Sequence, residues 1–307
     1  MPKKPTETRQ GMPDIPGVIK TDAVLIAGPK ATRKLQPVEV VQEDALTLRI
    51  EDVGDYTLMW TPTVTDRGLA QGFTLEDGLL GDEEHPEGLC LALGFALSEG
   101  LITQLTDLKS ISACPEQPAT VQLQLQHPER VEAARKNVLV NSSCGICGPR
   151  EILEENRLNL QPVEDNLRIS PDDFPQLIAG MQQQQSIFAR TGGSHAAAIF
   201  DQSGRIIAAA EDLGRHNALD KVIGSVLIQR GNLRRCGVLL SSRLSLEMVL
   251  KAVRCGLQLM LAVSAPTSLA IDVAQRFGVT LCGFVRDSRA TIYSHPQRLP
   301  EVLDDFG

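Results

Sequence analysis

Hydrophobic and polar positions alternate with two different periodicities in the first half of the chain, one typical of strands and one typical of helices. Residues 44–60, DALTLRIEDVGDYTLMW, alternate with a period of two on either side of a turn at 52–55, which predicts two strands. The stretches 121–127, VQLQLQH, and 136–142, KNVLVNS, predict two more strands. Between these strands, residues 86–102 place apolar side chains at helical spacing and predict a helix that ends near Gly100.

Two short segments of this half resemble each other. GFTLEDGLL at 72–80 is similar to GFALSEGLI at 94–102. Two copies do not make a repeat protein, so we interpret them as two short helices, alike by local duplication or by chance.

The next predicted element is one helix that begins near Ser170 and stops before Thr191. Ser170 suits the N-cap and Pro171 the first turn, and the carboxylates of Asp172 and Asp173 face the positive end of the helix dipole.

Strands and helices then alternate to the end of the chain. A hairpin of two strands is predicted at 195–200 and 205–211, around the turn DQSG. Helices follow at 215–230, 244–256 and 268–278, and strands at 236–241, 259–265, 279–285 and 289–295. This order predicts a layered α/β sheet.

Composition narrows the class of protein. The 307 residues suffice for one large or two modest domains, and a net charge of −8 argues against nucleic-acid binding. The polar, proline-rich residues 1–17 predict a disordered tail rather than a signal peptide, and no apolar run is long enough to span a membrane. Seven cysteines without framework spacing favour a reducing cytoplasm.

Cys144 and Cys147 form a single CxxC among asparagine, serine and glycine residues. A structural zinc site usually needs a second pair of ligands, and a thioredoxin-like site needs a helix start after the first cysteine. A third interpretation is a persulfide carrier, whose cysteine must reach both a donor and an acceptor. The pair alone does not choose among these three. We expect the other cysteines to fill the core: Cys90, Cys114, Cys236, Cys255 and Cys282.

Four loops combine a cation or histidine with glycine or hydroxyl residues, a pattern that suits an anion such as phosphate. The candidate binding residues are Gly192, Gly193, His195, Gly214, Arg215, His216, Asn217, Lys221, Arg243, Arg286 and Arg289. Each has a plain alternative: a structural histidine, a surface cation or, for Glu247 and Lys251, an i, i+4 ion pair. Their recurrence at predicted strand ends favours a shared ligand site.

Taken together, these stretches resemble the FdhD family, the sulfur carriers needed for formate dehydrogenase maturation. The similarity lies in SSCGICG, TGGSHAAAIF, EDLGRHNALDKVIG, SSRLSLEMVLKA, APTSLAIDVA, VTLCGFVRDSRATIY and LALGFALSEGLI, which lie in the family's order between residues 90 and 293.

The resemblance implies a mechanism. A cysteine desulfurase would pass sulfur as a persulfide to Cys144, with Cys147 as its partner, on a mobile loop at 141–150. The carrier would transfer it to the molybdenum bis(molybdopterin guanine dinucleotide) cofactor before the cofactor enters apo formate dehydrogenase. The segment implied to contact this cofactor is Phe284, Val285, Arg286, Asp287, Ser288 and Arg289. Guanosine diphosphate should mimic the cofactor. The rival function is a nucleotide-binding regulatory module with a CxxC redox switch.

The resemblance also implies a cytoplasmic sulfurtransferase, commonly a homodimer, with a cytidine-deaminase-like α/β region at 151–307 and a smaller N-terminal α+β region at 18–140. The zinc of deaminases is not implied, because no HxE stands beside a PCxxC. The chain departs from the family in two places. Ser242 stands where a glycine is usual, which predicts fewer backbone contacts to a ligand there, and residues 64–90 form an additional segment.

Overall fold

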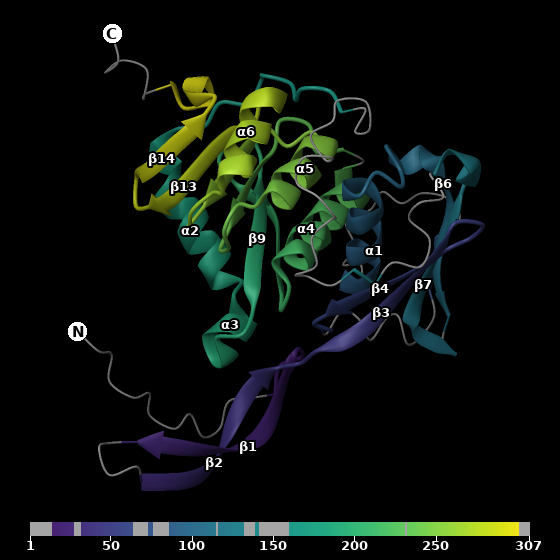
Figure 1. The fold of residues 1–307 in the computed structure, drawn as a ribbon, viewed down its shortest axis with the longest axis vertical. Coiled ribbons are helices and arrows are strands. Elements are labelled where there is room, and N and C mark those ends of the chain that lie inside the picture. The colour runs from purple at the N-terminus through teal and green to yellow at the C-terminus, as the bar shows by residue number, and fades with distance from the viewer. Residues whose placement is uncertain are drawn as a thin grey trace.

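The computed structural model describes residues 14–27, 32–63, 73–75, 86–114, 116–131, 139–140, 160–230 and 232–300. It shows a mixed α/β protein with two six-stranded sheets and a separate two-stranded ribbon (Figure 1). No helix within these ranges is long and apolar enough to cross a membrane. The α/β class is therefore confirmed, while the cytidine-deaminase-like layering stays a prediction.

The C-terminal sheet has the strand order β10-β9-β11-β12-β13-β14. Strands β11, β12 and β13 run parallel, and β9, β10 and β14 are antiparallel to their neighbours. The strands are β9 (His195–Phe200), β10 (Ile206–Asp212), β11 (Gly237–Leu240), β12 (Leu259–Ala262), β13 (Thr280–Arg286) and β14 (Arg289–Ser294). All six were predicted at nearly these bounds.

Helices cover both faces of this sheet. One face packs on α4 (Arg215–Arg230), α5 (Leu246–Arg254) and α6 (Ser268–Phe277), and the other on α2 (Phe174–Gln183). The strands divide their side chains accordingly, because Ala197 and Ile199 face the first layer while Ala196 and Ala198 face the second. The near-continuous apolar runs of the inner strands follow from this double burial.

The prediction of one helix from Ser170 to Thr191 was wrong. The hydroxyl of Ser170 does accept from the backbone N–H of Asp172, but the helix ends at Gln183 and a separate helix α3 (Ser186–Thr191) follows. Glu211 explains the break, because its carboxylate accepts hydrogen bonds from the backbone N–H groups of Ile187 and Phe188 and so caps a new helix start.

The N-terminal sheet has the strand order β5-β6-β7-β3-β4-β8. Its strands are β3 (Asp44–Ile50), β4 (Gly54–Trp60), β5 (Phe73–Leu75), β6 (Leu108–Cys114), β7 (Gln117–Leu125) and β8 (Leu139–Val140). The prediction of a helix at 72–80 was wrong for its described part, since Phe73–Leu75 pairs with β6. Pairing across the sheet overrides the local pattern there.

Helix α1 (Glu87–Ser98) lies between this sheet and α4, with nearly every side chain buried. The two helices cross at glycines. A Cβ atom on Gly94 would lie 1.7 Å from the carbonyl oxygen of Asp220, and one on Gly224 would lie 1.8 Å from that of Cys90. The close crossing therefore requires glycine on both helices and joins the two sheets through one core.

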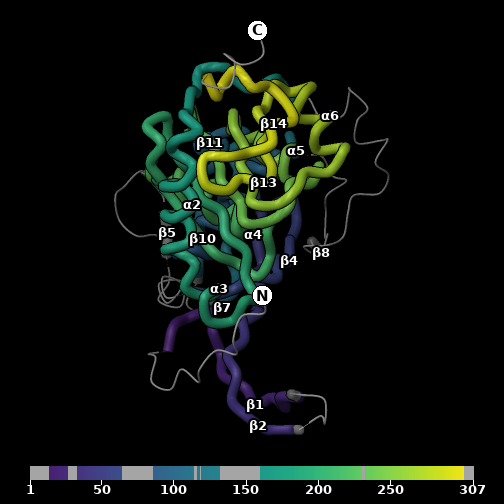
Figure 2. The backbone as a smooth tube through the Cα atoms, turned by 90° about the vertical axis from the view of Figure 1, so that its left-hand side faces the viewer, coloured from purple at the N-terminus to yellow at the C-terminus, as the bar shows by residue number. Residues whose placement is uncertain are grey.

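The remaining strands, β1 (Val18–Ala27) and β2 (Thr32–Val41), form an antiparallel ribbon that projects away from the body (Figures 1 and 2). Our sequence analysis did not predict this ribbon.

Candidate functional site

The candidate site lies at one edge of the C-terminal sheet. The register places His195 at the start of β9 beside Asp212 at the end of β10, and Leu240 and Ala262 end β11 and β12 on the same side. Hydrogen bonds join the loops that follow. The Ser241 hydroxyl accepts from the N–H of Ala196 at 2.9 Å, and the N–H of Phe284 donates to the Ser264 carbonyl at 3.1 Å. The glycine, histidine and arginine loops predicted from sequence thus share the carboxyl edge of the parallel strands, where α/β proteins bind ligands.

The turn before α4 is fixed by a buried carboxylate, Asp212. Its oxygens accept hydrogen bonds from the backbone N–H groups of Gly214 and Thr61 and from the Asn217 amide, at 2.9–3.0 Å. Thr61 in turn accepts from the N–H of Leu213 through its hydroxyl at 3.1 Å. Asp212 and Thr61 were not predicted as site residues, although Asp212 lies only two positions before the start of the GRHN motif.

Lys221 lies inside the protein rather than on the loop surface. Its side chain is 0% exposed and makes ion pairs of 2.9 Å with Asp212 and Glu87, and it donates to the carbonyls of Thr61 and Glu211. Burial alone would lower the pKa of Lys221, but the two carboxylates outweigh burial and raise this pKa above its ordinary value. We therefore assign Lys221 to holding the turn instead of contacting a ligand.

Asn217 is engaged in the same way. Its amide donates to the Met59 carbonyl and to Asp212, and the residue is only 7% exposed. The predicted binding cluster at the α4 start consequently divides into a buried support, Asn217 and Lys221, and two residues nearer the edge, Arg215 and His216.

The surroundings of His195 lower the pKa of its imidazole. Burial lowers the pKa of His195 below its usual 6.5, and the positive charge of Arg215 lowers it further. His216 Nε2 lies 3.0 Å from the Glu247 carboxylate, and this hydrogen bond lowers the pKa of Glu247. The expected Glu247–Lys251 pair was wrong, because Lys251 is buried and pairs instead with Asp220 and Glu99 at 2.8 Å.

The charge of Arg215 gives a testable effect on His195. Arg215→Ala should raise the pKa of His195, because it removes a positive charge that disfavours the imidazolium. The imidazole signal of His195, followed by NMR against pH, should have its midpoint below 6.5 in the unmodified protein and a higher midpoint in the variant. Arg205→Ala, in the turn at the opposite sheet edge, is the matched control and should leave the midpoint unchanged. An unchanged midpoint in Arg215→Ala would contradict the proposed coupling.

Apart from His216 Nε2, which faces the Glu247 carboxylate, two polar atoms at this edge are buried without a hydrogen-bond partner among the described residues: Nε of Arg215 and Oγ of Ser245. Buried donors of this kind are normally satisfied, and an exception calls for a ligand or an ordered group. Ser245 precedes α5, and Arg243, two residues before it, is exposed. Sequence reasoning missed Ser245, although SSRLS marks a run of hydroxyls.

The turn between β13 and β14 carries exposed cations beside an exposed aromatic ring. The register shifts between Gly283 and Arg286, which places a bulge at Phe284. Phe284 has φ +55° and is 48% exposed, whereas the next residue, Val285, is buried. A non-glycine residue at positive φ is unusual, and such strain collects at functional sites. The predicted residues Arg286, Asp287, Ser288 and Arg289 are all exposed at this tip.

The predicted catalytic pair, Cys144 and Cys147, lies outside the described residues. Four other cysteines are buried thiols, as predicted: Cys90, Cys236, Cys255 and Cys282. Burial raises the pKa of the Cys282 thiol to about 12 and that of Cys255 further, so neither forms a reactive thiolate at neutral pH.

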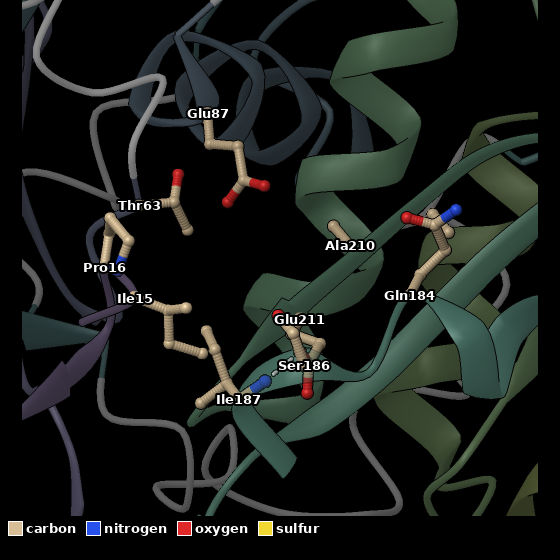
Figure 3. A pocket seen from close by; sticks show the side chains of 10 residues that line it. Ile15, Pro16, Thr63, Glu87, Gln184, Ser186, Ile187, Ala210 and Glu211 are labelled. Atoms are coloured by element: carbon tan, nitrogen blue, oxygen red, sulfur yellow. Dashed lines mark hydrogen bonds between the residues drawn. The ribbon is translucent and has the colours of Figure 1, made fainter. Parts of the chain in front are cut away.

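A separate hollow of about 320 Å³ opens between α1, α3 and β10 (Figure 3). Two carboxylates line it, Glu87 and Glu211, and both already serve internal partners: Lys221 and the start of α3. This acidic lining does not suit an anionic ligand, so the hollow is not the binding site predicted from the sequence.

Fold and site together define an α/β protein that presents cationic loops and an exposed aromatic ring at one sheet edge. The profile of the FdhD/NarQ family matches residues 85–300. The chain belongs to this family.

Several relatives are similar over most of the chain. The sulfur carrier protein FdhD of Bordetella bronchiseptica is 33% identical over 290 residues, which cover 93% of this chain and 96% of that protein. The protein of the same name from Xanthomonas axonopodis pv. citri is 41% identical over 213 residues, 68% of this chain and 75% of its own. A crystal structure of a putative formate dehydrogenase accessory protein from Desulfotalea psychrophila has the same fold, with a TM-score of 0.68 and 22% identity over 92% of this chain and all of that one.

Proposed function

We propose that this protein is a sulfur carrier that serves the maturation of formate dehydrogenase. Family membership and the relatives named sulfur carrier protein FdhD support this role. The neighbour in structure, a putative formate dehydrogenase accessory protein, supports the same client. The further details proposed are a cysteine desulfurase as donor, a homodimer as the working form, the cytoplasm as location and a cytidine-deaminase-like layering of the C-terminal region.

The substrate proposed for the cationic edge is the molybdenum bis(molybdopterin guanine dinucleotide) cofactor. The observation that carries this proposal is the buried Nε of Arg215, which has no partner among the described residues and belongs to the same sheet edge as the loops of Arg243, Arg286 and Arg289. The pyrophosphates of the cofactor would accept charge-assisted hydrogen bonds from four arginines: Arg215, Arg243, Arg286 and Arg289. The exposed ring of Phe284 offers a face on which a guanine base can stack.

The sulfur step proposed for Cys144 conserves electrons. The Cys144 thiolate attacks the outer sulfur of the desulfurase persulfide, the donor's S–S bond breaks, and its cysteine leaves as a thiolate. Cys144 then holds the sulfane sulfur until a nucleophilic acceptor on the cofactor attacks it, whereupon the S–S bond to Cys144 breaks and Cys144 leaves as a thiolate, with Cys147 as partner thiol. Cys255 and Cys282 do not suit this step, because burial raises the pKa of both thiols.

The fate of the thiols separates this function from a CxxC redox switch. Incubation with a cysteine desulfurase and cysteine should add the mass of one sulfur atom per chain, located by peptide mapping at Cys144. A switch would instead lose two hydrogens as a disulfide forms between Cys144 and Cys147. Persulfide found only on other cysteines would reject the proposed carrier site.

The cationic edge should bind guanosine diphosphate, and single arginines should matter. Arg215→Ala or Arg286→Ala should weaken binding by about tenfold or more, because each loses a charge-assisted hydrogen bond worth about 1.5–3 kcal/mol. Isothermal calorimetry measures the change, with Arg205→Ala as the matched control at the far edge. Equal affinity in all three variants and the unmodified protein would reject the edge as the nucleotide site.

A further inference from the structure

Strands β1 and β2 are the only described strands that belong to neither six-stranded sheet. Their ribbon projects well beyond the body in both views (Figures 1 and 2). An isolated two-stranded ribbon is marginally stable in water, and three or more strands are normally needed. The projecting ribbon therefore calls for a further contact.

Apolar side chains are exposed on both faces of this ribbon. The register sets Val24 opposite Leu35 on one face, while Ile19 and Leu25 lie on the other. The exposed fractions are 47% for Ile19, 56% for Val24, 47% for Leu25, 63% for Ile26 and 66% for Leu35. Five large apolar side chains gathered on one projecting element indicate a surface that another chain covers.

The base of the ribbon is held firmly, next to the candidate site. Arg190 on α3 makes a bidentate ion pair with Glu39 on β2, and Arg190 is almost fully buried. A Cβ atom on Gly193 would lie 2.9 Å from Val41 Cγ1, so the ribbon packs closely on the loop that leads to His195. A ribbon fixed at its base loses little freedom when its outer part binds.

The two edges of the ribbon differ in their capacity to pair. The N–H of Gln42 donates to the carbonyl of Gly17 at 2.8 Å, so Gly17 and Gln42 form a hydrogen-bonded pair. Hydrogen-bonded and non-hydrogen-bonded pairs alternate along the ribbon from there. Asp22 and Pro37 are then a non-hydrogen-bonded pair, whose N–H positions point away from the ribbon. Pro37 has no N–H, which removes a donor from the outer edge of β2. Strand β1 has no proline, and its outer edge pairs with no other strand among the described residues, so we call it the open edge.

We propose that two copies of this chain associate through the open edge of β1, paired antiparallel across a two-fold axis at Thr21. This register sets Lys20 of one copy opposite Asp22 of the other, twice per dimer, and Val18 opposite Val24. Shifting the axis to Lys20 or to Asp22 would bring like charges face to face, which disfavours those registers. Lys20 pairs with Asp14 within the chain, but both side chains are largely exposed and this contact is readily exchanged.

The inference rests on the homodimer of the proposed function and names its surface. Thr21 would face its own copy as a non-hydrogen-bonded pair, at a Cα–Cα distance of about 4.5 Å, within the range of a disulfide. Thr21→Cys, oxidised with diamide, should give a covalent dimer on a non-reducing gel. Ala23→Cys is the matched control, because its nearest copy would lie several residues away, and it should match the unmodified chain. Absence of the Thr21→Cys dimer, or equal cross-linking at both positions, would overturn the register.

Proline substitution tests the edge itself. Val24→Pro removes an N–H from the open edge, while Leu35→Pro removes its counterpart from the β2 edge of the same pair, and neither affects the ladder inside the ribbon. Sedimentation should show the unmodified chain and Leu35→Pro as dimers and Val24→Pro with a dissociation constant raised at least about tenfold. A dimer of unchanged strength in Val24→Pro would overturn this surface and leave the homodimer standing. A monomeric unmodified chain would overturn both, and persulfide loading measured on the same samples reports on sulfur carriage separately.

Discussion

Replacing Cys144 by serine should abolish sulfur transfer to the cofactor, the largest effect we expect from any single substitution. Serine keeps the size of the side chain, but its hydroxyl does not ionise at neutral pH and cannot form a persulfide. The measurement is the sulfur gained per chain after incubation with a desulfurase, together with the activity of formate dehydrogenase matured by the variant.

The matched control for Cys144→Ser uses a buried thiol. Cys282→Ser alters a cysteine whose pKa burial raises to about 12, so this variant, provided that it folds, should load sulfur like the unmodified protein. Cys147→Ser distinguishes a required partner thiol from a dispensable one. Full sulfur loading in Cys144→Ser would reject the assignment of the persulfide to this residue.

Asp212→Ala should be the most destabilising of the substitutions considered. It removes a fully buried carboxylate, leaves the Lys221 ammonium short of one partner, and strips three donors of their acceptor: Thr61, Gly214 and Asn217. Breaking one side of a buried ion pair costs about 3–5 kcal/mol, so the urea midpoint should fall sharply.

Two comparisons make the Asp212 result specific. Asp212→Asn keeps an acceptor oxygen and should lose less stability than alanine. Asp55→Ala removes the exposed pair with Arg49 and should leave the midpoint nearly unchanged. If Asp212→Ala and Asp55→Ala were equally mild, the buried network would not hold the turn before α4. Guanosine diphosphate binding should fall with Asp212→Ala even where the protein remains folded, because this turn positions Arg215.

The elements that could be predicted from the sequence are those whose hydrophobic and polar side chains repeat with a single clear periodicity. The strands and helices after His195 were predicted because each buries a face with its own period. The break between α2 and α3 was missed because its cause, the carboxylate of Glu211, lies more than twenty positions downstream in the chain. Likewise, nothing local in 72–80 indicates that Phe73–Leu75 pairs with β6.

The site was predictable as a set of residue types, but not in its division of roles. The GRHNALDK motif correctly marked a charged helix start, yet it could not show that Lys221 points inward or that Nε of Arg215 has no partner in the part of the chain that the structure describes. That difference depends on Asp212, Glu87 and Thr61, which come from three separate parts of the chain. The amino-acid sequence shows that a side chain is charged, but it does not show which residues neutralise that charge in the folded protein.

The crossing of α1 and α4 limits how this molecule can move. With Gly94 and Gly224 each against the opposite backbone, the helices have no room to slide or rotate past each other. The two sheets therefore behave as one frame, and a shear or hinge between them is not a route for carrying sulfur. Sulfur delivered to the cationic edge, as we propose, would therefore have to arrive there without any rearrangement of the two sheets.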